Sequence, residues 1–143
     1  MEGKYSMKRY IWIAFCVILL MTIGLSGCQE NSSNNGKSFE GIALESDIVE
    51  LAHASKEFIK DDNEIIRVEV QYLFKNIARR DIQFKVFAEF YDKNNNLLNT
   101  SSQKEFIIPD GYTETSVLPA NIISYDGEDC KQVDHITIKT IEI

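Results

Sequence analysis

The chain of 143 residues contains little cysteine: it has three, Cys16, Cys28 and Cys130. The first two lie within or directly after an N-terminal apolar stretch, so Cys130 is the sole cysteine of residues 29–143. A disulfide within one chain needs two thiols, and none can therefore form in that part of the chain. We expect its fold to be held together by a hydrophobic core.

Glycine, histidine and basic residues are also scarce, and each shortage excludes a class of function. The seven glycines are scattered, so the chain has neither a glycine-rich phosphate loop nor a Gly-x-Ser-x-Gly nucleophile turn. The two histidines, His53 and His135, are far apart in the sequence. Lys and Arg number 15 against 22 Asp and Glu, whereas nucleic-acid binding requires clustered cations. The composition predicts a protein that is neither an enzyme nor a nucleic-acid-binding protein.

The N-terminus has the pattern of a secretory signal peptide. Lys4, Lys8 and Arg9 precede an uncharged and almost wholly apolar stretch from Ile11 to Leu25, which is followed by small residues. Translation could start at Met1 or at Met7. The alternative is an uncleaved membrane helix, but the stretch is at or below the lower limit of about 17 residues for a span. We therefore expect cleavage and an extracytoplasmic location.

The residues Leu25-Ser26-Gly27-Cys28 resemble the lipobox of prokaryotic lipoproteins. The resemblance implies that the Cys28 thiol receives a diacylglycerol, and that a signal peptidase recognises Leu25, Ser26 and Gly27 and cuts before Cys28. It implies no other cofactor. Two or more acyl chains anchor a protein stably, so the predicted attachment to the membrane is through lipid.

The predicted cleavage site and the start of the apolar pattern at residue 39 divide the chain into three parts. Residues 1–27 form the signal peptide, residues 28–38 the lipidated cysteine with a polar tether, and residues 39–143 a single domain. The cut removes three of the 15 basic and one of the 22 acidic residues, so the net charge changes from −7 to −9. An acidic domain of this kind is not expected to dock on anionic lipid by charge.

Alternation of apolar and polar residues predicts an all-β domain. In Ile66–Phe74 and in Ile82–Phe90 the even-numbered positions are apolar, which gives each segment one face for the core. Further extended segments are expected, with turns at Lys60–Glu64, Asp92–Asn96 and Pro109–Gly111. These segments are Asp47–Ser55, with a helical turn as the alternative, Leu97–Leu98, Lys104–Ile108, Tyr112–Leu118 and His135–Ile143. About seven strands and no helix predict an antiparallel β-sandwich.

The order of these segments resembles small immunoglobulin-like domains of prokaryotic envelope lipoproteins, such as the FxLYD domains. Tyr91 and Asp92 match the motif of that family before an Asn-rich turn, and a Pro-x-Gly turn follows later. Phe90 stands where the family has Leu, and Ala88 where it has Phe. The resemblance implies an immunoglobulin-like fold and no common catalytic residues.

The densest group of potential ligand residues lies near the C-terminus. Asp126, Glu128, Asp129 and His135 surround Cys130 in the sequence, and a metal ion would need three or four such ligands. Negative neighbours disfavour a reactive thiolate at Cys130. A solvated acidic loop explains the group better, so no metal site is predicted, and a small-ligand or metal-binding lipoprotein using Asp126–His135 stays as the alternative.

Three apolar residues of the central segments are out of phase with the core. Leu73, Phe87 and Tyr91 would form an apolar patch if they were exposed together, and such patches mark partner surfaces. The alternative is that another strand or the N-terminal segment covers them. The leading interpretation is a lipid-anchored, non-catalytic module that binds a protein or assembles at the membrane surface.

Overall fold

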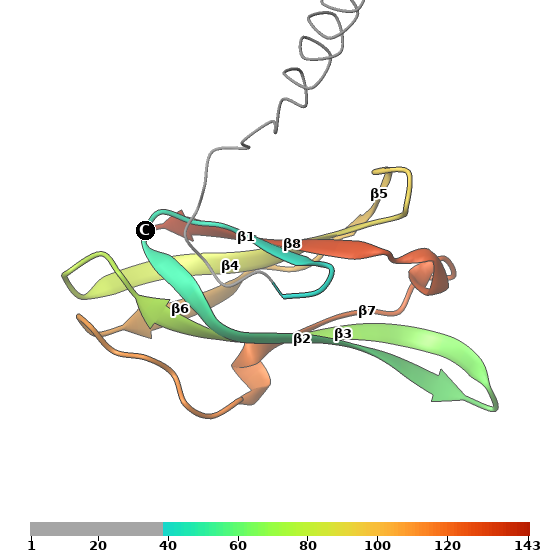
Figure 1. The fold of residues 1–143 in the computed structure, drawn as a ribbon, viewed down its shortest axis with the longest axis horizontal. Helices are drawn as coiled ribbons and strands as arrows, with labels where there is room; N and C mark the ends of the chain where they lie inside the picture. The colour runs from blue at the N-terminus through green and yellow to red at the C-terminus, as the bar shows by residue number, and fades with distance from the viewer. Residues whose placement is uncertain (1–38) are drawn as a thin grey trace, which may run out of the picture. The chain divides into compact units, whose positions relative to one another are not determined.

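The computed structural model describes residues 39–143, which form two β-sheets packed face to face (Figure 1). The predicted signal peptide, lipobox and tether lie outside the described residues. Within residues 39–143, no helix is long and apolar enough to cross a membrane. The elements are β1 (Ile42–Glu45), β2 (Val49–Asp61), β3 (Glu64–Asn76), β4 (Ile82–Tyr91), β5 (Leu97–Thr100), β6 (Lys104–Ile108), η1 (Pro119–Asn121), β7 (Ile122–Tyr125), η2 (Cys130–Gln132) and β8 (His135–Glu142).

The first sheet has the order β1-β8-β4-β5, with β6 paired to the other end of β4, and the second has the order β2-β3-β7. The all-β sandwich is confirmed. In an immunoglobulin sandwich the strands A, B and E pair in one sheet and C, F and G in the other. Here β2, β3 and β7 take the places of A, B and E, and β4 and β8 those of C and F.

One detail of the predicted antiparallel sandwich was wrong. Residues 39–143 contain eight strands, close to the predicted number of about seven, but β1 pairs with β8 in parallel. β1 takes the place beside β8 that strand G has in immunoglobulin domains. The short link Ser46–Ile48 joins β1 to β2, so β1 must run toward the end of the sandwich where β2 starts, and this makes it parallel to β8.

The core lies between the two sheets and follows the predicted alternation closely. The even-numbered residues of β4 from Ile82 to Phe90 are at most 2% exposed, and in β3 those from Val68 to Phe74 are fully buried. Ile66, which the alternation also assigns to the core, is 45% exposed. The reason is that the β2–β3 hairpin extends beyond the rest of the sandwich, where the first sheet does not cover its face (Figure 1).

Four aromatic rings form the centre of the core: Tyr72, Phe74, Phe84 and Phe106. The centroids of contacting rings lie 5.0 to 6.1 Å apart, within the range of favourable aromatic pairs. The rings come from three strands in both sheets, so their packing joins the two layers.

The predicted turns are confirmed. Asp62 and Asn63 both have positive φ, as the two central residues of a type I′ hairpin require. The Asp92 carboxylate accepts hydrogen bonds from the backbone N–H groups of Asn94 and Asn96. The first predicted segment is a strand, as preferred, and its register shifts between Leu51 and His53.

The segment between β6 and β7 differs from the prediction. Tyr112–Leu118 was expected to be an extended strand, but it makes only an isolated bridge from Thr113 to Lys75. Instead, its polar groups are bonded to the core: the Glu114 carboxylate accepts hydrogen bonds from the backbone of Phe74 and the side chain of Asn121. These long-range bonds replace a strand ladder.

Two lysines join the sheets at opposite edges of the sandwich. Lys104 of β6 donates hydrogen bonds to the carbonyl groups of Pro119, at 3.0 Å, and Ile122 on the side of the second sheet. Burial lowers the pKa of Lys104. At the other edge, Lys56 of β2 donates to the carbonyl group of Asp134, just before β8.

Candidate interaction surface

The outer face of the first sheet carries two of the three predicted partner-surface residues. Phe87 and Tyr91 alternate with the buried residues of β4 and are both half-buried on its solvent side. On β8 the residues opposite them are Lys139 and His135. We call this side of β4 and β8 the outer face.

Tyr91 and His135 form a stacked pair at one end of the outer face. Their ring centroids lie 5.2 Å apart with an angle of 6° between the planes. The register of β4 and β8 makes them direct neighbours, and the Nδ1 atom of His135 lies 3.2 Å from a carboxylate oxygen of Asp134. The stack presents a flat aromatic surface with polar edges.

A charged network holds the side chains next to this stack. The Tyr91 hydroxyl donates a hydrogen bond to the Glu89 carboxylate, and the amine of Lys139 lies 2.9 Å from Glu89 and 3.2 Å from Glu45. The bond from Tyr91 and then the one from Lys139 lower the pKa of Glu89. The bond to Glu89 also raises the pKa of Tyr91, which keeps its hydroxyl protonated. The network fixes side chains in place and does not create a reactive group.

We expect this network to lose its stabilising effect in acid. Because the pKa of Glu89 in the folded protein is below its ordinary value of 4.5, its contribution is present above that pH and disappears as the pH falls through the folded-state pKa. Glu89→Gln should therefore lower the free energy of unfolding at pH 7, by less than about 1 kcal/mol because the pair lies on the solvent side of the sheet and is only half-buried. The measurement is urea unfolding of both proteins from pH 7 down to about pH 3, where the difference should approach zero. A difference that is independent of pH would contradict this assignment, and Glu105→Gln on an exposed position of β6 provides the control.

Toward the other end, the outer face becomes apolar. Ile141 lies opposite Lys85, and Ile107 lies opposite Gln83, whose carbonyl group accepts a hydrogen bond from the backbone of Ile143. Ile107, Ile141 and Ile143 are 73%, 49% and 61% exposed. The partner surface predicted from the sequence did not include these three isoleucines. The alternation within His135–Ile143 could have identified Ile141 and Ile143, but the exposure of Ile107 depends on which strands cover it.

Leu73 does not belong to this surface. It lies on β3 in the second sheet, opposite His53, and is only 9% exposed. The three residues therefore do not form one patch, because β3 and β4 belong to different sheets whose outer faces point away from each other. Of the three, Phe87 and Tyr91 are brought together.

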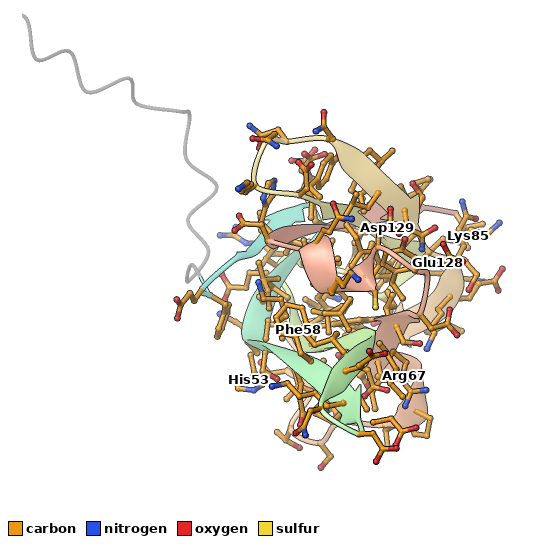
Figure 2. All side chains as sticks on the ribbon, turned by 90° about the vertical axis from the view of Figure 1, so that its right-hand side faces the viewer. His53, Phe58, Arg67, Lys85, Glu128 and Asp129 are labelled. Atoms are coloured by element: carbon orange, nitrogen blue, oxygen red, sulfur yellow. The ribbon has the colours of Figure 1, made fainter. Side chains whose placement is uncertain are left out.

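The acidic region from Asp126 to His135 is spread over different sides of the structure. Cys130 is 2% exposed within the core, with its sulfur 3.8 Å from the carbonyl oxygen of Ile65, whereas His135 lies on the outer face. Asp129 accepts a hydrogen bond from Tyr125, and Glu128 is exposed beside it at the end of the sandwich that faces the viewer in Figure 2. Residues 39–143 contain no group of three or more His, Cys, Asp or Glu side chains that could hold a metal ion.

Burial also determines what Cys130 can do. A thiol enclosed in the core cannot reach a second chain, so an intermolecular disulfide would require local opening. Asp126, Glu128 and Asp129 remain as an acidic surface of the connection between β7 and β8. Cys28, the predicted lipidation residue, and Leu25, Ser26 and Gly27, the predicted recognition residues, lie outside the described residues.

Comparison with known proteins identifies no family. No family model matches the chain, and no curated protein sequence matches it. Among solved structures, the crystal structure of Campylobacter jejuni cj0090 matches with a TM-score of 0.45 and 12% sequence identity, over 73% of this chain and 100% of that chain. This similarity is too low to transfer a function.

Proposed function

We propose that the protein is a lipid-anchored envelope protein whose β-sandwich binds a protein partner at the outer side of a membrane, without catalysis. The observation that carries the proposal is the sequence Leu25-Ser26-Gly27-Cys28 at the end of an apolar stretch that follows basic residues. A diacylglycerol on Cys28 would supply the membrane attachment that the acidic domain cannot obtain from charge.

The tether supports a role near the membrane surface. Gln29 to Ser38 contains no apolar residue, a composition typical of a tether between a lipidated cysteine and a domain.

The outer face supports binding better than catalysis. It combines the exposed Ile107, Ile141 and Ile143 with Phe87 and with an aromatic stack whose polar groups are already hydrogen-bonded. Apolar and aromatic residues with fixed polar neighbours are typical of protein-binding surfaces.

The test is crosslinking in intact cells, followed by mass spectrometry of what remains attached to the lipidated protein. We expect the wild-type protein in the membrane fraction together with a reproducible partner, and we expect Cys28→Ser to lose lipidation, processing and that partner. If Cys28→Ser were still cut at the same site, the lipobox would be misidentified. If the well-expressed wild-type protein crosslinked to nothing, binding of a protein partner would be excluded, and the acidic region around Cys130 would be the next site to test.

A further inference from the structure

Strand β2 is a long edge of the second sheet. It has 13 residues and pairs on one side with β3. Within residues 39–143, no backbone hydrogen bond reaches it from another element on its other side. An edge of this kind presents every second N–H and C=O group to solvent and can accept an additional strand.

The central part of this edge is regular. The pairing with β3 shifts register between Leu51 and His53 and again between Ile59 and Lys60, and it is continuous from His53 to Ile59. Such irregularities prevent pairing along the whole edge, because they interrupt the row of backbone groups. The regular stretch between them is long enough for one short extended segment.

The two faces of this stretch differ. His53, Ser55 and Glu57 are exposed on the outer side of the sheet, whereas Ala54, Lys56 and Phe58 face the space between the sheets. Phe58 is only partly buried although it packs against the core. At His53 the ring of Phe39 packs edge-on against the imidazole, with ring centroids 5.8 Å apart. An added strand would therefore find a polar side in solvent from Ser55 onward and an incompletely covered apolar side.

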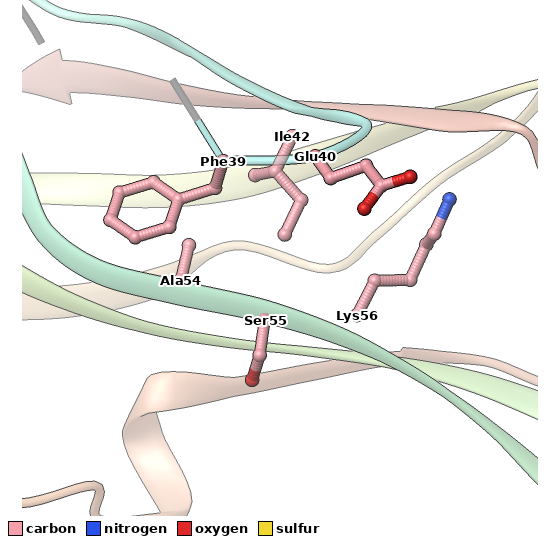
Figure 3. A pocket seen from close by; sticks show the side chains of 6 residues that line it. All are labelled: Phe39, Glu40, Ile42, Ala54, Ser55 and Lys56. Atoms are coloured by element: carbon pink, nitrogen blue, oxygen red, sulfur yellow. The ribbon is translucent and has the colours of Figure 1, made fainter. Parts of the chain in front are cut away.

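A pocket opens beside the same residues. It has a volume of about 310 Å³ and is lined by Phe39, Glu40, Ile42, Ala54, Ser55 and Lys56. In Figure 3 Phe39, Ile42 and Ala54 lie together, the side chains of Glu40 and Lys56 extend toward the same end, and the Ser55 side chain points away. This volume is at the lower limit of small-molecule sites, which measure about 300–1,000 Å³. It suits one inserted side chain better than a cofactor.

We propose that an extended segment of the protein partner adds to the β2 edge between His53 and Ile59 and inserts an aliphatic side chain into this pocket. The inference rests on the proposed function, since it adds a contact made by an extended segment of the same partner to the one proposed for the outer face. In strand addition, backbone hydrogen bonds supply affinity and pockets for alternate side chains supply specificity. The segment must have apolar residues at alternate positions and no proline among the paired residues, because proline lacks the N–H donor.

The binding test uses the full chain in detergent micelles and a display library of random twelve-residue peptides. We expect the selected peptides to share alternating apolar residues, and the best of them to slow hydrogen exchange at alternate amides of residues 53–59. Failure to select any such peptide, or protection at other residues, would overturn the proposal. Protection that increases with protein concentration before peptide is added would show that a second copy occupies the edge, which would also overturn it.

Substitution at the pocket provides the matched pair of variants. Ala54→Leu fills the pocket and should raise the peptide Kd at least tenfold, whereas Ser124→Leu, at an exposed position of β7 outside the pocket and away from the β2 edge, should leave it unchanged. Because Ala54 is buried, hydrogen exchange of β4 is measured in the same sample to confirm that the variant is folded. Equal effects of both substitutions would contradict insertion of a side chain.

A second measurement does not depend on any protein variant. Methylation of single backbone amides of the selected peptide should abolish binding when the methylated residue is one of the alternate residues that pair with β2. Methylation of the residues between them should be tolerated. If methylation were tolerated at every residue, strand pairing would be excluded. In cells, a photo-crosslinking residue is placed at Ser55 or at Phe87. A partner captured from Phe87 and not from Ser55 would overturn this inference and leave the proposed function intact, whereas the absence of any partner would count against the proposed function itself.

Discussion

Replacing Asn76 with Ala is expected to lower the free energy of unfolding by about 3 kcal/mol. The Asn76 side chain is 3% exposed, and its amide group donates hydrogen bonds to the carbonyl groups of Arg80, Ile108 and Pro109 at 2.7, 3.0 and 2.9 Å. Its carbonyl oxygen accepts one from the backbone of Ala78. The substitution removes these bonds from the buried carbonyl group of Ile108 and from the partly buried groups of Arg80 and Ala78, whereas the Pro109 carbonyl still accepts a bond from the backbone of Tyr112. A buried polar group left without a partner costs about 1–3 kcal/mol. Urea unfolding measures the loss.

The control for this substitution is Asn94→Ala in the exposed turn after β4, for which a change within about 0.5 kcal/mol is expected. Asn76→Asp tests the donor groups of the side chain separately from its acceptor. The aspartate keeps an oxygen that can accept the bond from Ala78, but it replaces the N–H donors with a carboxylate oxygen that faces carbonyl oxygens. The neighbouring carbonyl oxygens should raise the pKa of the new carboxyl group. The loss in free energy of unfolding of Asn76→Asp relative to wild type should therefore be larger at pH 7 than at about pH 4. A loss below about 1 kcal/mol for Asn76→Ala would show that water replaces the amide.

The second large effect is expected on strand β4, where two phenylalanines have opposite roles. Phe84→Ala should lower the free energy of unfolding by about 3–5 kcal/mol, because it removes a fully buried ring from the aromatic cluster and leaves a cavity. Phe87→Ser, on the outer face of the same strand, should cost about 1 kcal/mol and instead weaken the complex with the partner. The measurements are thermal unfolding of both variants and capture of the crosslinked partner by Phe87→Ser.

The comparison between these two substitutions distinguishes a core position from a surface position. Unfolding of Phe87→Ser at the temperature where wild type is folded would place Phe87 in the core and remove it from the interaction surface. If a folded Phe87→Ser variant captured the partner normally, Phe87 would not contribute to binding. The β2 edge, which is separate from the outer face, would then be the site to test.

The core could be predicted from the sequence because the alternation of side chains depends only on the local backbone. In β4 every even-numbered residue from Ile82 to Phe90 is buried, as expected for a strand with one covered face. The turns could be predicted for a similar reason, since Asp62 and Asn63 tolerate positive φ and the Asp92 carboxylate bonds to its own turn.

Other features could not be predicted because they depend on residues far apart in the chain. β1 and β7 have four residues each, and a short apolar segment becomes a strand only where β8 or β3 offers a free edge. Ile66 follows the core alternation but is exposed, because the β2–β3 hairpin extends beyond the rest of the sandwich (Figure 1). Leu73 and Phe87 have equivalent positions in the pattern but lie in different sheets, so only one joins the outer face.

The amino-acid sequence by itself determined that residues 39–143 form an all-β fold, which residues of the central strands face the core and where most of the turns lie. These properties follow from side-chain periodicity and backbone preferences within short segments. The tertiary structure decided that Cys130 is enclosed while His135 is on the surface, that Tyr91 stacks on His135, and that β2 has a free edge beside a pocket. Those relations arise from the pairing and stacking of strands, which no local pattern encodes.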